Sequence, residues 1–80
     1  MTMLFRCRGY RIVIFSNDHG PPHIHVLNDG SATIAVGKTI DDLRVIRANG
    51  IPRRMRREIF ERIIEQREAI LRAWNDIHGY

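Results

Sequence analysis

The amino-acid sequence predicts an α+β fold, with an antiparallel sheet of four to five strands and one long C-terminal helix packed on it. Two patterns support this class. Residues 3–48 contain short β-branched and aromatic runs separated by turn-forming residues, whereas residues 53–78 carry apolar side chains three and four positions apart. A chain of 80 residues is short, so we expect a single domain, residues 1–80, with a thin core.

Five segments are strand candidates because each is short, apolar or alternating, and bounded by residues that favour turns. They are Met3–Cys7, Tyr10–Ser16, His23–Leu27, Ser31–Val36 and Leu43–Arg47. The second segment is almost continuously apolar, so we expect it to be central and covered on both faces. The fifth contains two arginines, which favours the edge of the sheet. Turns are expected at Arg8-Gly9 and at Asn28-Asp29-Gly30.

The second half of the chain predicts one amphipathic helix from Arg53 to His78, about 39 Å long if straight. A proline near its first position and Gly79 after its last are typical helix boundaries. We expect Phe60 and Trp74 to pack in the core, and His78 to interact favourably with the helix dipole. The apolar stripe is long for so small a sheet. We therefore expect a partner, or a second copy of the chain in a homodimer, to cover part of it.

Basic residues outnumber acidic ones by thirteen to nine, which gives a net charge of +4, and twelve of the thirteen are arginine. The guanidinium group suits phosphates and carboxylates, so RNA and an acidic protein are both candidate partners. No apolar stretch is long enough to span a membrane, and the N-terminal residues do not resemble a signal peptide. The single Cys7, interpreted as a strand residue, excludes an internal disulfide and favours a cytoplasmic location.

Three of the four histidines lie in the block Asn17–Val26, which contains the sequence Asp-His-Gly-Pro-Pro-His-Ile-His-Val. The two prolines favour an extended segment, and the alternation that follows them is the pattern of a strand. His23 and His25 are therefore expected on one face of that strand, with Ile24 and Val26 on the core side. The block thus presents two imidazoles on an accessible face.

Three interpretations of this histidine block are open. His19, His23 and His25 could act as general base and general acid on RNA, with an arginine stabilising the charged transition state. Alternatively, His23 and His25, with a further ligand from the loop, could bind a divalent transition metal such as zinc, copper, nickel or iron. In the third interpretation the histidines only fix the loop, by hydrogen bonding to backbone carbonyls and to Asp18.

A cluster of arginines crowds the predicted start of the helix. Its members are Arg53, Arg54, Arg56 and Arg57. Cations at this end oppose the helix dipole and repel one another, so the arrangement costs stability unless an anion is bound. We therefore expect the cluster to bind a substrate phosphate or an acidic partner, and Asp18 of the histidine block is likewise predicted to take part in binding the substrate or partner. A solvated basic surface is the alternative.

The chain resembles one small bacterial family, domain of unknown function 4160. The resemblance depends on the block Asp18–Val26, the strand before it, the hairpin after it, and the basic Pro-Arg-Arg start of a helix that ends near Trp74. It covers nearly the whole chain, from about Gly9 to Trp74, and the block itself is highly specific. The segment Ala48–Ile51 departs from the turn that is common in the family.

This resemblance implies a toxin-like protein that is inhibited by a protein antitoxin, since many family members are encoded beside a protein of domain of unknown function 2442. It implies no particular reaction. The predicted function is the toxin component of a type II toxin–antitoxin pair, inhibited by an acidic antitoxin and acting on RNA through its histidines and arginines. The alternative predictions are a non-enzymatic module that binds nucleic acid or protein, and a metal-binding domain.

Overall fold

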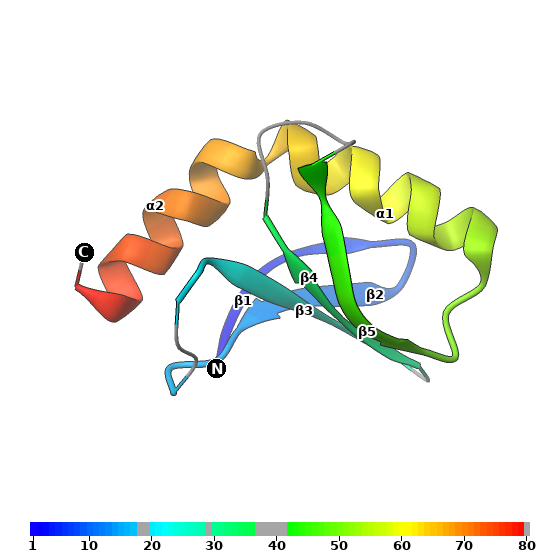
Figure 1. The fold of residues 1–80 in the computed structure, drawn as a ribbon, viewed down its shortest axis with the longest axis horizontal. Helices are drawn as coiled ribbons and strands as arrows, with labels where there is room; N and C mark the ends of the chain where they lie inside the picture. Colours follow the sequence, from blue (N-terminus) through cyan, green and yellow to red (C-terminus); the bar gives the residue numbers. More distant parts are fainter. Residues whose placement is uncertain (18–19, 29, 37–41, 80) are drawn as a thin grey trace.

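The computed structural model describes residues 1–17, 20–28, 30–36 and 42–79 (Figure 1). An antiparallel sheet is followed by two helices. The strands are β1 (Thr2–Cys7), β2 (Tyr10–Ile14), β3 (His23–Leu27), β4 (Ser31–Ala35) and β5 (Arg44–Asn49). The helices are α1 (Arg53–Glu65) and α2 (Arg67–His78). The predicted α+β class and the antiparallel sheet are confirmed.

The strands lie in the sheet in the order of the chain, β1-β2-β3-β4-β5, and each pairs antiparallel with its neighbour. This order puts β3 in the middle, whereas the sequence predicted that the strand at Tyr10–Ser16 would be central. Strand β2 does have a neighbour on each side. Its residues Ile12, Val13 and Ile14 are all fully buried, so the expected burial of both faces is confirmed. Strand β5 lies at the edge, as expected.

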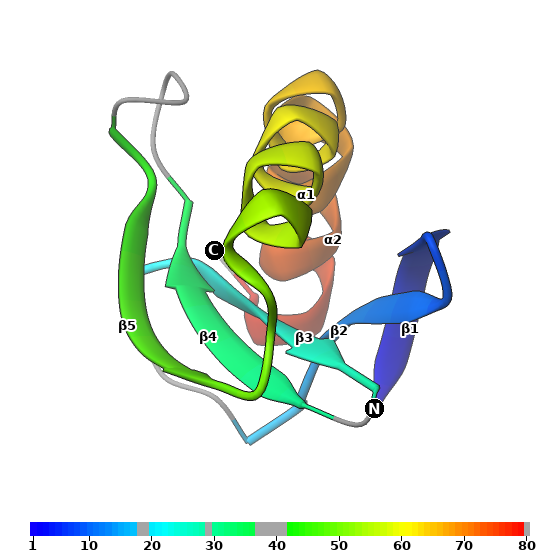
Figure 2. The same ribbon diagram turned by 90° about the vertical axis from the view of Figure 1, so that its right-hand side faces the viewer.

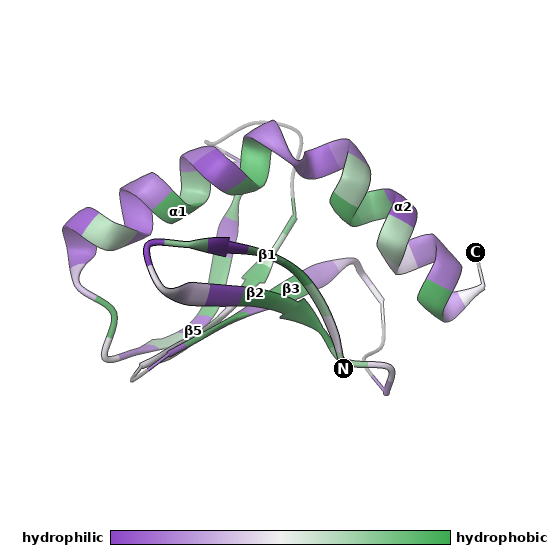
Figure 3. Ribbon diagram, turned by 180° about the vertical axis from the view of Figure 1, so that it is seen from behind, coloured by the Kyte–Doolittle hydropathy of each residue, from purple (hydrophilic) through white to green (hydrophobic). Residues whose placement is uncertain are grey.

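One face of the sheet, the inner face, packs against both helices (Figure 2). The sheet curves around the helices, with β1 and β5 on either side of them, and the apolar sides of the helices are turned toward the sheet (Figure 3). The core is one cluster built from both layers. It consists of Cys7, Ile12, Ile14, Ile24, Val26, Ala32, Ile34, Ile51, Ile59, Ile63, Ile70 and Trp74. Burial of this apolar surface is the main force that holds the helices to the sheet.

The opposite face of the sheet, the outer face, is not covered by either helix, although Trp74 of α2 contacts His23 at the start of β3. Strand register places its side chains in rows that cross the sheet. One row is Met3, Val13, His25, Thr33 and Arg47, and the next is Arg6, Arg11, Leu27, Ser31 and Asn49. None of the five strands, all of whose residues are described, contains an aspartate or a glutamate. The charged side chains of the five strands are therefore all basic.

The prediction of a single long helix is wrong, because the chain forms two helices that meet at Gln66. Gln66 has φ −100° and ψ 12°, which are not helical values. A straight helix over the whole segment would be about 39 Å long, whereas the longest extent of the molecule is 34 Å. Polar Gln66 and Arg67 also occupy the turn between Ile63 and Ile70, where a straight helix would have to bury an apolar side chain.

The bend lets α2 follow the curve of the sheet, so that Ile70 and Trp74 are 1% and 0% exposed. The expected core positions of Trp74 and Phe60 are confirmed, Trp74 inside the cluster and Phe60 packed against it. Neither helix combines the length and the apolar character that crossing a lipid bilayer requires. Packing of a partner or a second copy against the helices stays a prediction.

Two glycines end or join elements for different physical reasons. Gly79 follows α2 with φ 77°, and its N–H donates to the carbonyl of Asn75, so the predicted helix end is confirmed. Gly30 directly precedes β4 in the β3–β4 hairpin. A Cβ at Gly30 would lie 2.5 Å from the carbonyl oxygen of Asn49. Close approach of the chain after β5 therefore requires this glycine.

The core should depend on Ile63 far more than on a surface isoleucine of the same size. Ile63 is fully buried and Ile46 is 57% exposed. We expect Ile63→Val to lower the free energy of unfolding by about 0.5–1.5 kcal/mol, and Ile46→Val to change it by less than about 0.5 kcal/mol. Urea unfolding followed by circular dichroism measures both. Equal losses in the two variants would contradict the described core.

Candidate active site on the outer face of the sheet

Strand β3 places His23 and His25 together on the outer face, because side chains alternate along a strand. Ile24 and Val26 are fully buried on the inner face, whereas both histidines are half-buried. The two imidazole rings meet edge to face, with centroids 5.3 Å apart and planes at 73°. The predicted placement is confirmed, and the rings are close enough to contact one substrate group together.

A backbone carbonyl determines where the proton sits on His23. Its Nδ1 lies 2.9 Å from the carbonyl oxygen of Pro21. A carbonyl oxygen can only accept, so Nδ1 carries the hydrogen and donates it, and Nε2 is the basic nitrogen of the neutral ring. A histidine that acts as a general base through Nε2 needs this tautomer. The same bond ties His23 to the proline segment, as the loop-fixing interpretation expected.

His25 is held by its neighbours on both adjoining strands. Thr33, its partner on β4, places Oγ1 3.3 Å from His25 Nδ1. A hydroxyl can donate or accept, so this contact is compatible with either tautomer of His25 and with the protonated ring. The ring of Phe15, the residue after β2, lies 4.6 Å from the His25 ring between centroids. His25 thus has a defined position next to an aromatic side chain.

Helix α2 also reaches the histidines. The Trp74 ring lies 5.1 Å from the His23 ring between centroids, and His78 stacks on Trp74 at 3.9 Å. Nδ1 of His78 lies 3.1 Å from the Trp74 carbonyl oxygen and donates to it, which confirms the expected interaction of His78 with the end of the helix. The sequence did not predict the contact between Trp74 and His23, since it depends on the bend at Gln66.

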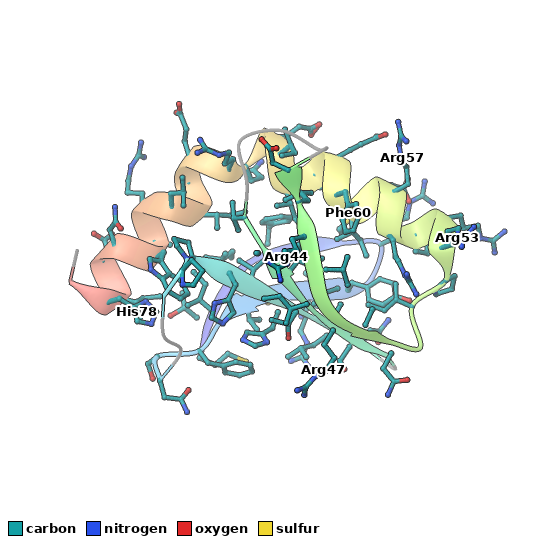
Figure 4. The ribbon with its side chains drawn as sticks, in the orientation of Figure 1. Arg44, Arg47, Arg53, Arg57, Phe60 and His78 are labelled. Carbon is teal, nitrogen blue, oxygen red and sulfur yellow. The ribbon has the colours of Figure 1, made fainter. Side chains whose placement is uncertain are left out.

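The helix-start arginines do not join this group. Arg53 and Arg57 lie at one end of the molecule, and His78 lies at the other (Figure 4). Two members of the cluster have structural contacts, since Arg56 Nε donates to the Ile51 carbonyl oxygen at 3.2 Å and Arg57 pairs with Glu61 at 3.1 Å. The arginines and the histidines therefore form two separate candidate surfaces.

Other arginines, which were not among the predicted site residues, do share the outer face with His25. Arg47 pairs with Thr33, which pairs with His25, and Figure 4 shows Arg47 on the side of the sheet away from the helices. Arg11 is diagonal to His25 across β2 and β3, and Arg6 lies opposite Arg11. Single arginines among apolar residues, such as Arg11 in the β2 sequence Tyr-Arg-Ile-Val-Ile, were the available sequence signal.

The family described as Domain of unknown function (DUF4160) matches residues 9–75, which is most of the chain. The chain belongs to the DUF4160 family. The DUF4160 match contains the whole histidine block, Arg11, Arg47 and Trp74, whereas Arg6 and His78 lie outside it. No curated protein and no solved structure matches the chain. The function of this DUF4160 member therefore has to be argued from its own side chains.

Two predicted site residues of the DUF4160 block, Asp18 and His19, lie outside the described residues. Within the described part of the chain, no three His, Cys, Asp or Glu side chains are grouped so that they could hold a metal ion. His23 and His25 alone would supply two ligands. Since Nδ1 of His23 donates to Pro21, that histidine would have to bind a metal through Nε2.

Cys7 is not a nucleophile of this site. It lies in β1 among the core residues and is 6% exposed. Burial, and to a smaller extent the nearby Glu58 carboxylate, raise the pKa of the Cys7 thiol, which disfavours the reactive thiolate. Its interpretation as a strand residue is confirmed.

Any transition metal that this protein binds should depend on His23 and His25. Zinc titration of protein without a histidine tag, by calorimetry, tests this. We expect His23→Ala combined with His25→Ala to abolish any stoichiometric binding, and His78→Ala to leave it intact, because His78 lies on α2, where it stacks on Trp74 at 3.9 Å. Stoichiometric zinc retained by the double variant would contradict the prediction.

Proposed function

We propose that this protein is the toxin component of a toxin–antitoxin pair and that it cleaves RNA at the outer face of its sheet. The observation that carries the proposal is the pair of imidazoles, 5.3 Å apart, on a sheet whose fully described strands contain arginines and no carboxylates. A cationic surface attracts the phosphodiester backbone. Histidine is the side chain that exchanges protons near neutral pH.

The proposed reaction uses the two histidines as a general base and a general acid. His23 Nε2 takes the proton of a ribose 2′-hydroxyl, and the 2′-oxygen forms a bond to the adjacent phosphorus. The bond between phosphorus and the 5′-oxygen breaks, and protonated His25 gives its proton to that oxygen. The products are a 2′,3′-cyclic phosphate and a 5′-hydroxyl. Atoms and protons balance without a metal or a co-reactant.

Arg47 is the arginine placed to stabilise the transition state of this reaction. It is exposed and lies two strands from His25, in the same row of the outer face. Two strand spacings correspond to about 9–10 Å between backbones, which long arginine and histidine side chains can bridge through a bound phosphate. Its guanidinium would donate to the non-bridging oxygens as negative charge develops on them.

The helix-start cluster is proposed to bind the acidic antitoxin. Arg53 and Arg54 are exposed and have no ion pair within the described residues, and α1 has no acidic residue in its first turn. Carboxylates of a partner would relieve the repulsion of these arginines with the helix dipole. Because this cluster and the histidines lie at opposite ends, an antitoxin that binds here has to extend along the molecule to cover the reaction site.

A non-enzymatic RNA-binding module is the second candidate function, and one observation favours it. The bond from His23 to Pro21 and the contact of His23 with Trp74 give this ring a structural role in holding the loop to α2. A binding module would need His23 for its fold and would release no product. The reaction products therefore separate the two functions.

Cleavage should depend on each histidine of the β3 pair. We expect His23→Asn and His25→Asn each to lower the rate of RNA cleavage by about 10²–10⁴-fold, whereas the control variant Asn75→Gln, at an exposed position of α2, should stay within about tenfold of wild type. Assays use a single-stranded RNA in chelator, and mass spectrometry identifies the 2′,3′-cyclic phosphate. Circular dichroism verifies the fold of each variant. Binding of RNA without cleavage by the wild-type protein would instead support the binding module.

A further inference from the structure

We infer that Arg6 and Arg11 form a subsite that binds the backbone of single-stranded RNA next to the histidine pair. The inference rests on the proposed function and adds the substrate class and the residues that position it. Its first support is the register of β1 and β2, which pairs Arg6 directly with Arg11 on the outer face. Like charges directly opposite one another in a sheet are destabilising, so a bound anion between them would relieve a cost of the fold.

Within the described part of the chain, no ion pair compensates the charge on these two arginines. Other arginines pair with carboxylates of α1, since Arg8 contacts Glu58 at 2.9 Å and Arg62 contacts Glu65 at 3.6 Å. Neither Arg6 nor Arg11 has an ion pair with any described residue, and the fully described strands around them contain no carboxylate. Arg6 is exposed and Arg11 is half-buried, so the phosphates of a polynucleotide can reach both.

The position of the pair connects it to the reaction site. Arg11 is opposite Leu27 on β3, and His25 is opposite Val13, two residues further along β2. Diagonal neighbours in an antiparallel sheet are about 7–8 Å apart. A polynucleotide with phosphates on Arg6 and Arg11 therefore passes directly beside His25, where the next phosphodiester meets the imidazole pair.

An aromatic side chain next to His25 favours a single strand over a duplex. Phe15 is half-buried, and its ring contacts the His25 ring at 4.6 Å between centroids. Aromatic side chains beside a basic surface bind single strands because unpaired bases stack on them, which the bases of a duplex cannot do. In this subsite a nucleobase of the RNA stacks on Phe15, and Arg6 and Arg11 bind the phosphates of the RNA backbone.

Binding of an uncleavable probe tests this subsite independently of catalysis. The probe is a fluorescent single-stranded 2′-O-methyl RNA of mixed sequence, titrated by anisotropy at several salt concentrations. Removing two phosphate contacts on a single strand should reduce the slope of log K against log salt by about 1.4. We expect this for the Arg6→Gln, Arg11→Gln variant, with an unchanged or higher Tm because two adjacent like charges are removed.

The matched control is the Arg53→Gln, Arg54→Gln variant, which loses the same charge at the helix start. It should keep the wild-type salt slope. Phe15→Leu should weaken binding of the single strand without changing the slope. Equal slopes for the two double variants, a duplex bound as tightly as the single strand, or binding of poly-glutamate without binding of the RNA would overturn the inference.

The outcome also separates this inference from the proposed function. If the wild-type protein cleaves no RNA but binds the probe through Arg6 and Arg11, the proposed reaction is wrong and the subsite stands. In a second outcome, the wild-type protein cleaves RNA, the histidine variants lose activity, and the salt slope of probe binding is unchanged in the Arg6→Gln, Arg11→Gln variant. The subsite is then wrong and the proposed reaction stands.

Discussion

The burial of one indole, Trp74, holds together the parts on which the candidate site depends. Trp74 is 0% exposed, belongs to the core cluster, and contacts both His23 on the sheet and His78 on its own helix. It reaches this position only because the helical segment bends at Gln66 and follows the curve of the sheet. The packing of α2 and the orientation of His23 on β3 therefore depend on the same side chain.

The indole nitrogen of Trp74 adds a constraint of its own. It is buried and has no hydrogen-bond partner among the described residues. Leaving such a donor without an acceptor costs about 1–3 kcal/mol. The packing of this large side chain has to offset that cost. Contacts of Trp74 with two imidazoles provide that packing, and they couple the stability of the helical layer to the geometry of the site.

Charge is divided between the two layers of the molecule. The helices contain acidic and basic residues that pair with one another, as in Arg57–Glu61, whereas the fully described strands contain only basic charged residues. Mixed charge suits a solvated helical surface. Strands that contain arginines and histidines and no carboxylates suit a polyanion. The outer face is therefore a better candidate for RNA than the helix start, even though the helix start has the denser run of arginines.

Much of the sheet could be predicted from the sequence, because alternation along β3 and the turn residues between strands act locally. The bend of the helix was missed because Ile63 and Ile70 are seven residues apart and fit one helical stripe. The polar pair Gln66 and Arg67 between them was the sequence signal against a straight helix. The contact of Trp74 with His23 depends on that bend. Pairing of Arg6 with Arg11 follows from the predicted turn at Arg8-Gly9, because Cys7 and Tyr10 flank that turn and pair with each other. The register shift between Met3 and Phe5 affects only the part of β1 farther from the turn.

A nuclear magnetic resonance titration shows whether RNA binds the outer face beside the histidines. The ¹⁵N-labelled wild-type protein is titrated with single-stranded 2′-O-methyl RNA, and amide shifts are followed along the chain. We expect the largest changes at outer-face positions of β1, β2 and β3, including Arg11 and His25. Changes concentrated at the start of α1, around Arg53 and Arg54, with β3 unaffected, would contradict this expectation.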